Sequence, residues 1–214
     1  MDLAPGSPAP DFKARLRETY DAHAAERDKM GEAGWRWPLC EQLITLLKTE
    51  KKDRLLEIGA GAGYTARYFA DRGLDVVAID LSPAQVERSR AKGLTAYHRD
   101  FYDLGFRMES FDAVWAMNCL LHVPSRDLGD VLSGIREVLV PNGVFCMGTW
   151  GGIAEEGTYE DDFYQPSRFF ALRTDDDLLE RVSAVFTVED FKQVKPPDAN
   201  DDRLHVQFIR ARRK

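Results

Sequence analysis

The chain has 214 residues, of which 44% are hydrophobic and 30% are charged, and its formal net charge is −7 at pH 7. This composition excludes wholesale disorder, and the length corresponds to about one domain. The negative charge argues against a general nucleic-acid binder, which usually presents a basic face. No apolar run approaches the ~20 residues of a membrane helix, and residues 1–10 lack the basic and apolar segments of a signal peptide. We therefore expect a cytoplasmic protein without membrane contact that begins with a flexible tail at residues 1–11.

The three cysteines, Cys40, Cys119 and Cys146, lie far apart in the sequence. An odd number without a CxxC pair argues against both a disulfide framework and a zinc site. We expect buried, reduced thiols. No cluster of His, Asp and Glu residues has the spacing of metal ligands, so we expect no metal ion.

Apolar periodicity predicts helices between residues 12 and 48, interrupted by a loop with two tryptophans at residues 31–37. Short apolar runs then alternate with helical stretches. Strands are predicted at 55–58, 76–79, 95–98, 113–117, 144–147, 188–194 and 204–210, and further helices at 63–70, 82–91, 127–138 and 175–185. A short loop joins the last two strands, which favours antiparallel pairing there.

Continuously apolar strands separated by helices indicate a parallel sheet that is covered on both faces. The fold class is therefore α/β: a Rossmann-like, doubly wound, mostly parallel seven-stranded sheet with an antiparallel last strand and a helical N-terminal cap. Right-handed crossovers place the ligand crevice at the carboxyl ends of the strands.

The most informative motif is Glu57-Ile58-Gly59-Ala60-Gly61-Ala62-Gly63, at a predicted strand-to-helix turn. Glycines there permit a tight turn and let backbone N–H groups approach a ligand. Asp80 closes the next strand, where a carboxylate can hold two ribose hydroxyls. Together these residues predict a cofactor that contains a nucleoside.

The residues around the glycine loop favour S-adenosylmethionine over a dinucleotide, but they do not decide between the two cofactors. A dinucleotide places its pyrophosphate at the helix N-terminus, where the Glu57 carboxylate would repel it. S-adenosylmethionine (SAM) has no phosphate and carries a cationic amine and a sulfonium, which suit a carboxylate. The register Gly61-x-Gly63-x-x-Ala66 nevertheless imitates the dinucleotide pattern, so NAD stays open. No Gly-Lys-Ser/Thr follows, which excludes a nucleoside triphosphatase loop.

From about residue 55 to residue 148, the chain resembles the class I SAM-dependent methyltransferases, in particular their small-molecule branch. The resemblance is carried by Leu55-Leu56-Glu57-Ile58-Gly59-Ala60-Gly61-Ala62-Gly63, Ile79-Asp80-Leu81-Ser82-Pro83, Arg99-Asp100-Phe101, Phe111-Asp112-Ala113-Val114, Leu121-His122-Val123-Pro124 and Leu139-Val140-Pro141-Asn142-Gly143. It implies a single domain at 12–214, divided into a helical cap (12–50), a SAM-binding core (51–150), a lid-like insertion (151–175) and a closing helix with strands (176–214).

The resemblance also implies roles for individual residues in binding SAM and its product S-adenosylhomocysteine (SAH). Asp80 would bind the ribose, Asp100 the adenine amine, and Phe101 would flank the adenine ring. Tyr20, in Tyr20-Asp21-x-x-Ala24, resembles an N-terminal tyrosine that closes over the cofactor. The candidate cofactor residues are Tyr20, Glu57, Gly59, Ala60, Gly61, Gly63, Tyr64, Thr65, Asp80, Leu81, Asp100, Phe101, Met117 and Asn118.

His122 is the candidate catalytic base, because it follows the fourth strand at the edge of the crevice. A neutral imidazole there could take a proton from an oxygen or nitrogen nucleophile. The alternative is that His122 packs beneath the cofactor loop. Both remain open, since positioning alone can supply ~7–11 kcal/mol of the barrier to methyl transfer, against ~3–5.5 kcal/mol from a base.

The resemblance fades at residues 12–50 and 151–175, the regions that would select an acceptor. These regions are rich in aromatic residues, which could hold a flat acceptor or simply pack the cap on the sheet. Asn118-Cys119-Leu120-Leu121 stands where enzymes that methylate nucleic-acid bases have Asn/Asp-Pro-Pro-Tyr, which points away from DNA.

We therefore expect methyl transfer to an oxygen or nitrogen of a small-molecule acceptor, by a monomer or homodimer. Three alternatives remain: a protein or RNA methyltransferase, an NAD-dependent oxidoreductase, and a SAM-binding protein without catalytic activity.

Overall fold

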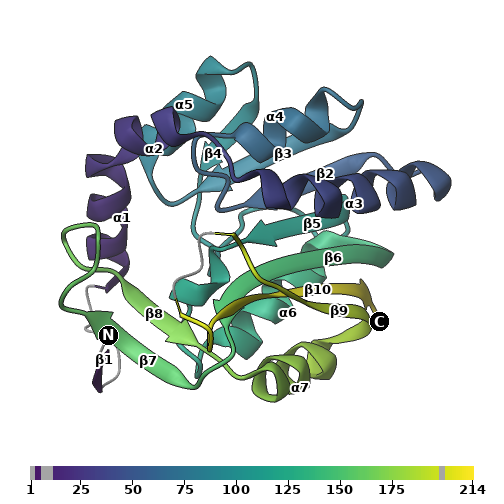
Figure 1. The fold of residues 1–214 in the computed structure, drawn as a ribbon. Helices are drawn as coiled ribbons and strands as arrows, with labels where there is room; N and C mark the ends of the chain where they lie inside the picture. The colour runs from purple at the N-terminus through teal and green to yellow at the C-terminus, as the bar shows by residue number, and fades with distance from the viewer. Residues whose placement is uncertain (1–2, 6–11, 198–200) are drawn as a thin grey trace.

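The central sheet of the computed structural model, which describes residues 3–5, 12–197 and 201–214, contains seven strands in the order β4-β3-β2-β5-β6-β10-β9 (Figure 1). These are β2 (Arg54–Ile58), β3 (Asp75–Asp80), β4 (Thr95–His98), β5 (Phe111–Met117), β6 (Leu139–Gly151), β9 (Phe186–Val194) and β10 (His205–Arg213). The strands from β4 to β6 pair in parallel, and β10 is antiparallel to both of its neighbours. The predicted sheet and its antiparallel closing strand are confirmed.

Helices cover both faces of this sheet, as the alternating sequence pattern indicates. The helices are α1 (Phe12–Ala22), α2 (Ala24–Met30), α3 (Trp37–Thr49), α4 (Tyr64–Ala70), α5 (Pro83–Ala91), α6 (Leu128–Val138) and α7 (Asp175–Val185), with 3-10 turns η1 (Gly34–Arg36) and η2 (Leu120–His122). One apolar cluster joins α3 and α4 to the sheet, and a second joins α6 and α7 to the opposite face. The three cysteines are buried and free.

Local sequence explains where these helices begin. Ser82 caps α5 by accepting a hydrogen bond from the backbone N–H of Gln85 at 3.1 Å, and Pro83 occupies the first turn. Thr174 caps α7, whose first turn carries three aspartates that complement the helix dipole. In α6, Leu128, Val131, Leu132 and Ile135 are buried at three- and four-residue spacing, so one helix face packs on the sheet.

A second, three-stranded sheet lies at one end of the molecule, in the order β1-β7-β8. It consists of β1 (Leu3–Pro5), β7 (Glu155–Tyr159) and β8 (Phe169–Leu172), all antiparallel. The sequence pattern missed these strands. In β7, acidic residues and Gly157 conceal the alternation of apolar and polar residues. The three-residue strand β1 lies inside the range that was expected to be a flexible tail. Its partner comes from residues 157–159. The other residues of that tail lie outside the described part of the chain.

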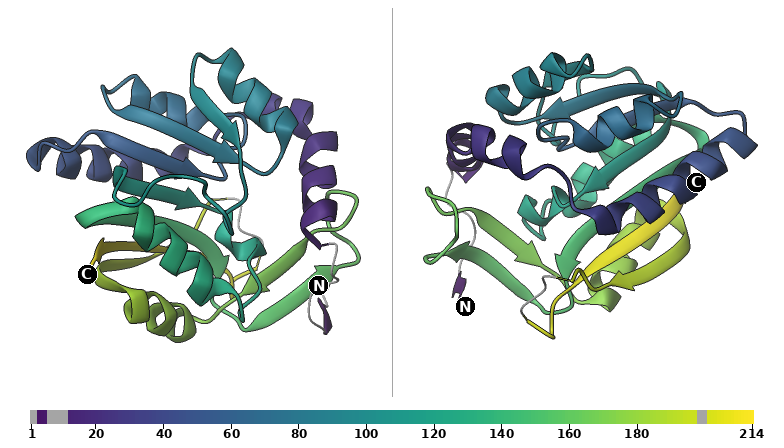
Figure 2. Two further views of the ribbon diagram at one scale, coloured as in Figure 1. Left: turned by 180° about the vertical axis from the view of Figure 1, so that it is seen from behind. Right: turned by 45° about the horizontal axis from the view of Figure 1, so that its top comes forward.

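The cap helices and the β7–β8 hairpin meet at the same end of the central sheet in both views (Figure 2). Phe12 packs edge-on against Phe169, and the hydroxyl of Thr19 donates a hydrogen bond to the carbonyl oxygen of Pro166. The His23 ring packs on Tyr164 with ring centroids 4.5 Å apart. The cap and the lid-like insertion are therefore in direct contact, above the carboxyl ends of the parallel strands.

Gly63 joins the glycine loop to α4 in a left-handed conformation, with φ at +83°. A Cβ atom there would lie 2.6 Å from Ser89 Oγ and 2.7 Å from Leu94 Cδ1. We expect Gly63→Ala to lower the free energy of unfolding by about 2–3 kcal/mol, from the left-handed backbone and the overpacking combined.

Urea denaturation of Gly63→Ala beside Gly134→Ala tests this expectation. Gly134 is helical, has open space around the position of a Cβ atom, and should gain up to about 1 kcal/mol from the same substitution. Equal stability of the Gly63→Ala variant and the unsubstituted protein would contradict the structural role given to Gly63.

Candidate functional site

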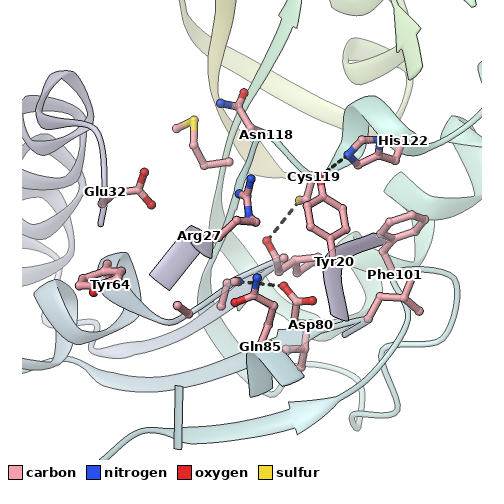
Figure 3. A pocket seen from close by; sticks show the side chains of 18 of the residues that line it. Tyr20, Arg27, Glu32, Tyr64, Asp80, Gln85, Phe101, Asn118, Cys119 and His122 are labelled. Carbon is pink, nitrogen blue, oxygen red and sulfur yellow. Dashed lines mark hydrogen bonds between the residues drawn. The ribbon is translucent and has the colours of Figure 1, made fainter. Parts of the chain in front are cut away.

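A pocket opens at the carboxyl ends of β2, β3 and β5, beneath the cap helices α1 and α2 (Figure 3). The glycine loop after β2 forms its floor, and Asp80 ends β3 at one side. From the cap, Tyr20, Arg27 and Glu32 project into it. This is the sheet edge at which parallel α/β folds bind their ligands.

Most of the predicted site residues come together in this pocket, and four do not. Lining it are Tyr20, Gly59, Ala60, Gly61, Tyr64, Asp80, Leu81, Phe101, Met117, Asn118 and His122. Glu57, Gly63, Thr65 and Asp100 lie outside its lining. Gly63 and Thr65 support the loop from behind, where Thr65 Oγ1 contacts Glu32 Oε2 at 3.3 Å.

Asp100 forms an ion pair with the cap instead of facing the pocket. Its Oδ2 lies 2.6 Å from Lys13 Nζ, and its Oδ1 accepts a hydrogen bond from the backbone N–H of Tyr102. The sequence could not indicate this pairing, because Lys13 is 87 positions away. Its contact with adenine therefore stays a prediction.

The carboxylate of Asp80 shapes the glycine loop. Its Oδ2 accepts a hydrogen bond from the backbone N–H of Gly61, and its Oδ1 accepts one from Ser82, both at 2.8 Å. Burial raises the pKa of Asp80 above its usual value, and these two N–H groups partly counteract the rise. Since an ionised carboxylate offers about four lone-pair positions, two remain for a ligand.

Glu57 lies beneath the loop, only 4% exposed, and its Oε2 has no hydrogen-bond partner in the described part of the chain. Burial raises the pKa of Glu57 well above its usual value, Glu32 raises it further, and Arg36 opposes the rise. An unpartnered buried carboxyl of this kind fits a ligand that brings a donor or a positive charge.

Five lining residues with a charged or amide side chain are absent from the candidates of the sequence analysis. They are Arg27, Glu32, Arg36, Gln85 and Arg99. Gln85, in the first turn of α5, is 1% exposed, and within the described residues neither its Nε2 nor its Oε1 has a partner. The signal for Gln85 was its position one helical turn after Asp80. Glu32 and Arg36 belong to a loop without periodicity, where they form an ion pair at 2.7 Å.

A hydrogen-bonded chain runs from Phe169 through His122 to Tyr20. His122 Nδ1 lies 2.7 Å from the carbonyl oxygen of Phe169, and His122 Nε2 lies 2.8 Å from the Tyr20 hydroxyl. A carbonyl oxygen can only accept, so Nδ1 carries the proton and Nε2 accepts from Tyr20. Burial lowers the pKa of His122 to about 3, so the ring is neutral at neutral pH.

Both nitrogens of His122 are thus occupied, and the ring is 3% exposed. Tyr20 stands between it and the pocket and also accepts a hydrogen bond from Arg168 Nη1 at 3.3 Å. Arg168 is in turn held by Asp162, with Nη2 2.7 Å from Oδ1. The group that this chain of contacts presents to a ligand is the Tyr20 oxygen (Figure 3).

Several aromatic and acidic residues of the cap and insertion serve packing. Trp37 stacks on Tyr68 at 4.3 Å, and Trp35 and Trp150 pack against the core. Asp162 forms an ion pair with Arg168. No member of its acidic run lines the pocket; the run consists of Glu155, Glu156, Glu160, Asp161 and Asp162. In the described part of the chain, no helix has the length and apolar character required to cross a membrane.

Residues 56–147 match the family described as "Methyltransferase domain". These residues of the chain carry a methyltransferase domain. Methyltransferase GfsG of Streptomyces halstedii is 32% identical over 161 residues, which cover 70% of this chain and 55% of that protein. The 27-O-demethylrifamycin SV methyltransferase of Amycolatopsis mediterranei is 33% identical over 119 residues, covering 51% and 43%. The chain thus spans about half the length of these curated relatives.

Solved structures share the fold of this chain. The Burkholderia thailandensis 1,6-didemethyltoxoflavin-N1-methyltransferase, with bound SAH, superposes with a TM-score of 0.77 at 23% identity, covering 99% of this chain and 92% of that one. The magnesium protoporphyrin IX methyltransferase of Synechocystis PCC 6803, with bound SAM, gives 0.69 at 14% identity, covering 98% and 100%. The cofactor of the family is SAM. The glycine loop, the free lone pairs of Asp80 and the unpartnered atoms of Glu57 and Gln85 fit such a ligand.

Proposed function

We propose that this chain transfers the methyl group of SAM to an oxygen or nitrogen atom of a small-molecule acceptor. The observation that carries the proposal is the composition of one pocket. At one end the glycine loop and Asp80 offer a nucleoside site, and at the other end a hydrogen-bonded tyrosine hydroxyl faces the same space. A donor and an acceptor bound there would be held side by side, which is the main requirement of an in-line displacement.

The charges of the pocket support SAM over a dinucleotide. Close to the glycine loop, Glu57 offers an unpartnered carboxyl oxygen and Arg36 offers a positive charge, which suit the ammonium and the carboxylate of a methionine end. Asp80 retains acceptor positions for ribose hydroxyls, and Gln85 adds a free amide one helical turn away. A pyrophosphate at the glycine loop would instead lie beside the carboxylates of Glu32 and Asp80 and be repelled.

Tyr20 is the residue that would orient the acceptor. SAM, when bound, supplies the methyl group as a sulfonium electrophile and departs as SAH. The Tyr20 proton points to His122 Nε2 and one lone pair of its oxygen accepts from Arg168, which leaves the second lone pair to accept a hydrogen bond from an acceptor hydroxyl or amine. His122 then acts through Tyr20 as a positioning residue, and the earlier assignment of His122 as a base becomes this indirect role. Relatives named for rifamycin SV and didemethyltoxoflavin support a small acceptor.

Calorimetric titration with SAM, SAH and NAD in parallel tests the cofactor. We expect micromolar binding of SAM and SAH and none of NAD, because a pyrophosphate at the glycine loop would lie beside the carboxylates of Glu32 and Asp80. Binding of NAD alone, or no measurable binding of either SAM or SAH, would overturn the proposed function.

Release of SAH in a screen of small acceptors then tests the reaction, with Tyr20→Phe as the matched variant. This variant removes one hydroxyl and should keep the affinity for SAH within about threefold. If Tyr20 guides the acceptor proton, turnover falls by about 10²–10⁴, the usual contribution of a positioned acid or base. Unchanged turnover would remove Tyr20 from the mechanism.

A further inference from the structure

Arg27 reaches into the pocket from α2 (Figure 3). Within the described residues its guanidinium has no hydrogen bond and no ion pair, and its recorded contacts are aromatic. It lies 5.1 Å from the ring centroid of Tyr20 and 5.7 Å from that of Tyr164. Cation–π contacts at these distances leave the guanidinium donors available to a ligand.

The neighbouring arginines of the cap and lid are engaged differently. Arg36 is paired with Glu32 at 2.7 Å, and Arg168 is paired with Asp162 at the same distance. Arg99, which also lines the pocket, is exposed and follows β4, on the side of Phe101. Arg27 is thus the cation of the described pocket that lies beside Tyr20 without an acidic partner.

The two inner arginines have different neighbours. Arg36 lies beside Glu32 and its charge lowers the pKa of Glu57, beneath the glycine loop. The charge of Arg27 lowers the pKa of both Asp80 and His122, and its aromatic contacts place it beside Tyr20 and Tyr164. Arg27 therefore lies between the proposed ribose site and the side of the pocket proposed for the acceptor.

The balance of charge in the pocket also favours an anion at that end. Arg27, Arg36 and Arg99 are opposed by Glu32 and Asp80, which leaves one positive charge, and SAM adds one more. Like charges in a partly desolvated pocket repel, and an anionic second ligand removes part of this repulsion.

We propose that the methyl acceptor is an organic anion with a carboxylate or phosphate group, and that Arg27 binds this group beside Tyr20. The inference rests on the proposed function and adds the substrate class to it. A planar guanidinium matches the two oxygens of such a group, and the rings of Tyr20 and Tyr164 hold the guanidinium in place.

The first test compares Arg27→Gln with Arg17→Gln, which makes the same charge change on an exposed position of the cap. We expect Arg27→Gln to keep the affinity for SAH within threefold and to improve the affinity for SAM relative to SAH at least threefold, because only SAM carries the repelled sulfonium charge. Arg17→Gln should change neither. A loss of more than tenfold for both ligands would show that Arg27 holds the cofactor carboxylate, and would overturn the inference.

The second test titrates the SAH complex with benzoate and with benzamide, which differ in charge and scarcely in shape. We expect benzoate to bind at least tenfold more tightly, and Arg27→Gln to abolish that preference without changing the binding of benzamide. Absence of the preference, or its persistence in the variant, would contradict the inference. If neither SAM nor SAH binds, the proposed function is contradicted independently of the role of Arg27. The preference for benzoate is then measured on the protein without a cofactor.

Discussion

Asp80→Ala is expected to weaken the binding of SAH by at least 100-fold. The substitution removes two acceptor positions for ribose hydroxyls, each charge-assisted hydrogen bond contributing about 1.5–3 kcal/mol. It also releases the backbone N–H groups of Gly61 and Ser82, which the carboxylate holds at 2.8 Å, so the glycine loop loses its fixed shape. Isothermal titration calorimetry with SAH measures the effect.

Asp71→Ala is the matched control for this substitution. Asp71 is a half-exposed carboxylate at the end of α4, paired with Arg67, and its loss should change the affinity for SAH by less than twofold. A thermal unfolding curve for each variant separates lost binding from lost folding. Affinity for SAH within tenfold of the unsubstituted protein in Asp80→Ala would remove Asp80 from the ribose site.

The second large effect concerns stability at acidic pH. His122 is buried, and its pKa is about 3 in the folded protein, against an ordinary value of 6.5. At a pH between these two values, His122 is protonated in the unfolded chain and neutral in the folded chain. Its contribution to stability is therefore complete above pH 6.5 and is lost as the pH falls from there toward 3. Between pH 7 and pH 5 the loss amounts to about 2 kcal/mol.

The comparison of the protein with its His122→Gln variant isolates this contribution. Glu57 and Asp80 have raised pKa values and act in the opposite direction, so the unsubstituted protein alone would report a mixture. We expect the difference in free energy of unfolding between the two proteins, measured with urea, to shrink by about 2 kcal/mol from pH 7 to pH 5. A difference that does not vary with pH would mean that folding leaves the pKa of His122 at its ordinary value.

The central sheet could be predicted because its information is local. Each of the seven strands is a short apolar run bounded by turns or helices, and the glycine loop with Asp80 is recognisable without any tertiary contact. The β7–β8 hairpin was not predicted, because its residues are stabilised by pairing with each other and with β1 across a long loop. Strands of this kind depend on tertiary context more than on intrinsic preference.

The residues of the candidate site likewise fall into those that the sequence could place and those that depend on tertiary contacts. Residues that follow strands in the sheet, such as Asp80, Phe101 and Asn118, were placed correctly in the pocket lining, since the fold dictates where strands end. Arg27 and Glu32 were missed because only the docking of the cap brings them to the pocket. The partners of Asp100 and His122 were likewise beyond the sequence, since Lys13 and Tyr20 lie 87 and 102 positions away.

The contacts that hold the cap helices also bear on how the two ligands would be positioned. Asp80 belongs to the sheet, whereas Tyr20 belongs to a helix that is fastened to the rest of the molecule through Thr19, His23 and Lys13. Under the proposed function, the distance between the cofactor and the acceptor is therefore set by this interface. We expect changes to contacts far from the reacting atoms, such as the one between His23 and Tyr164, to alter how well the two reactants are aligned.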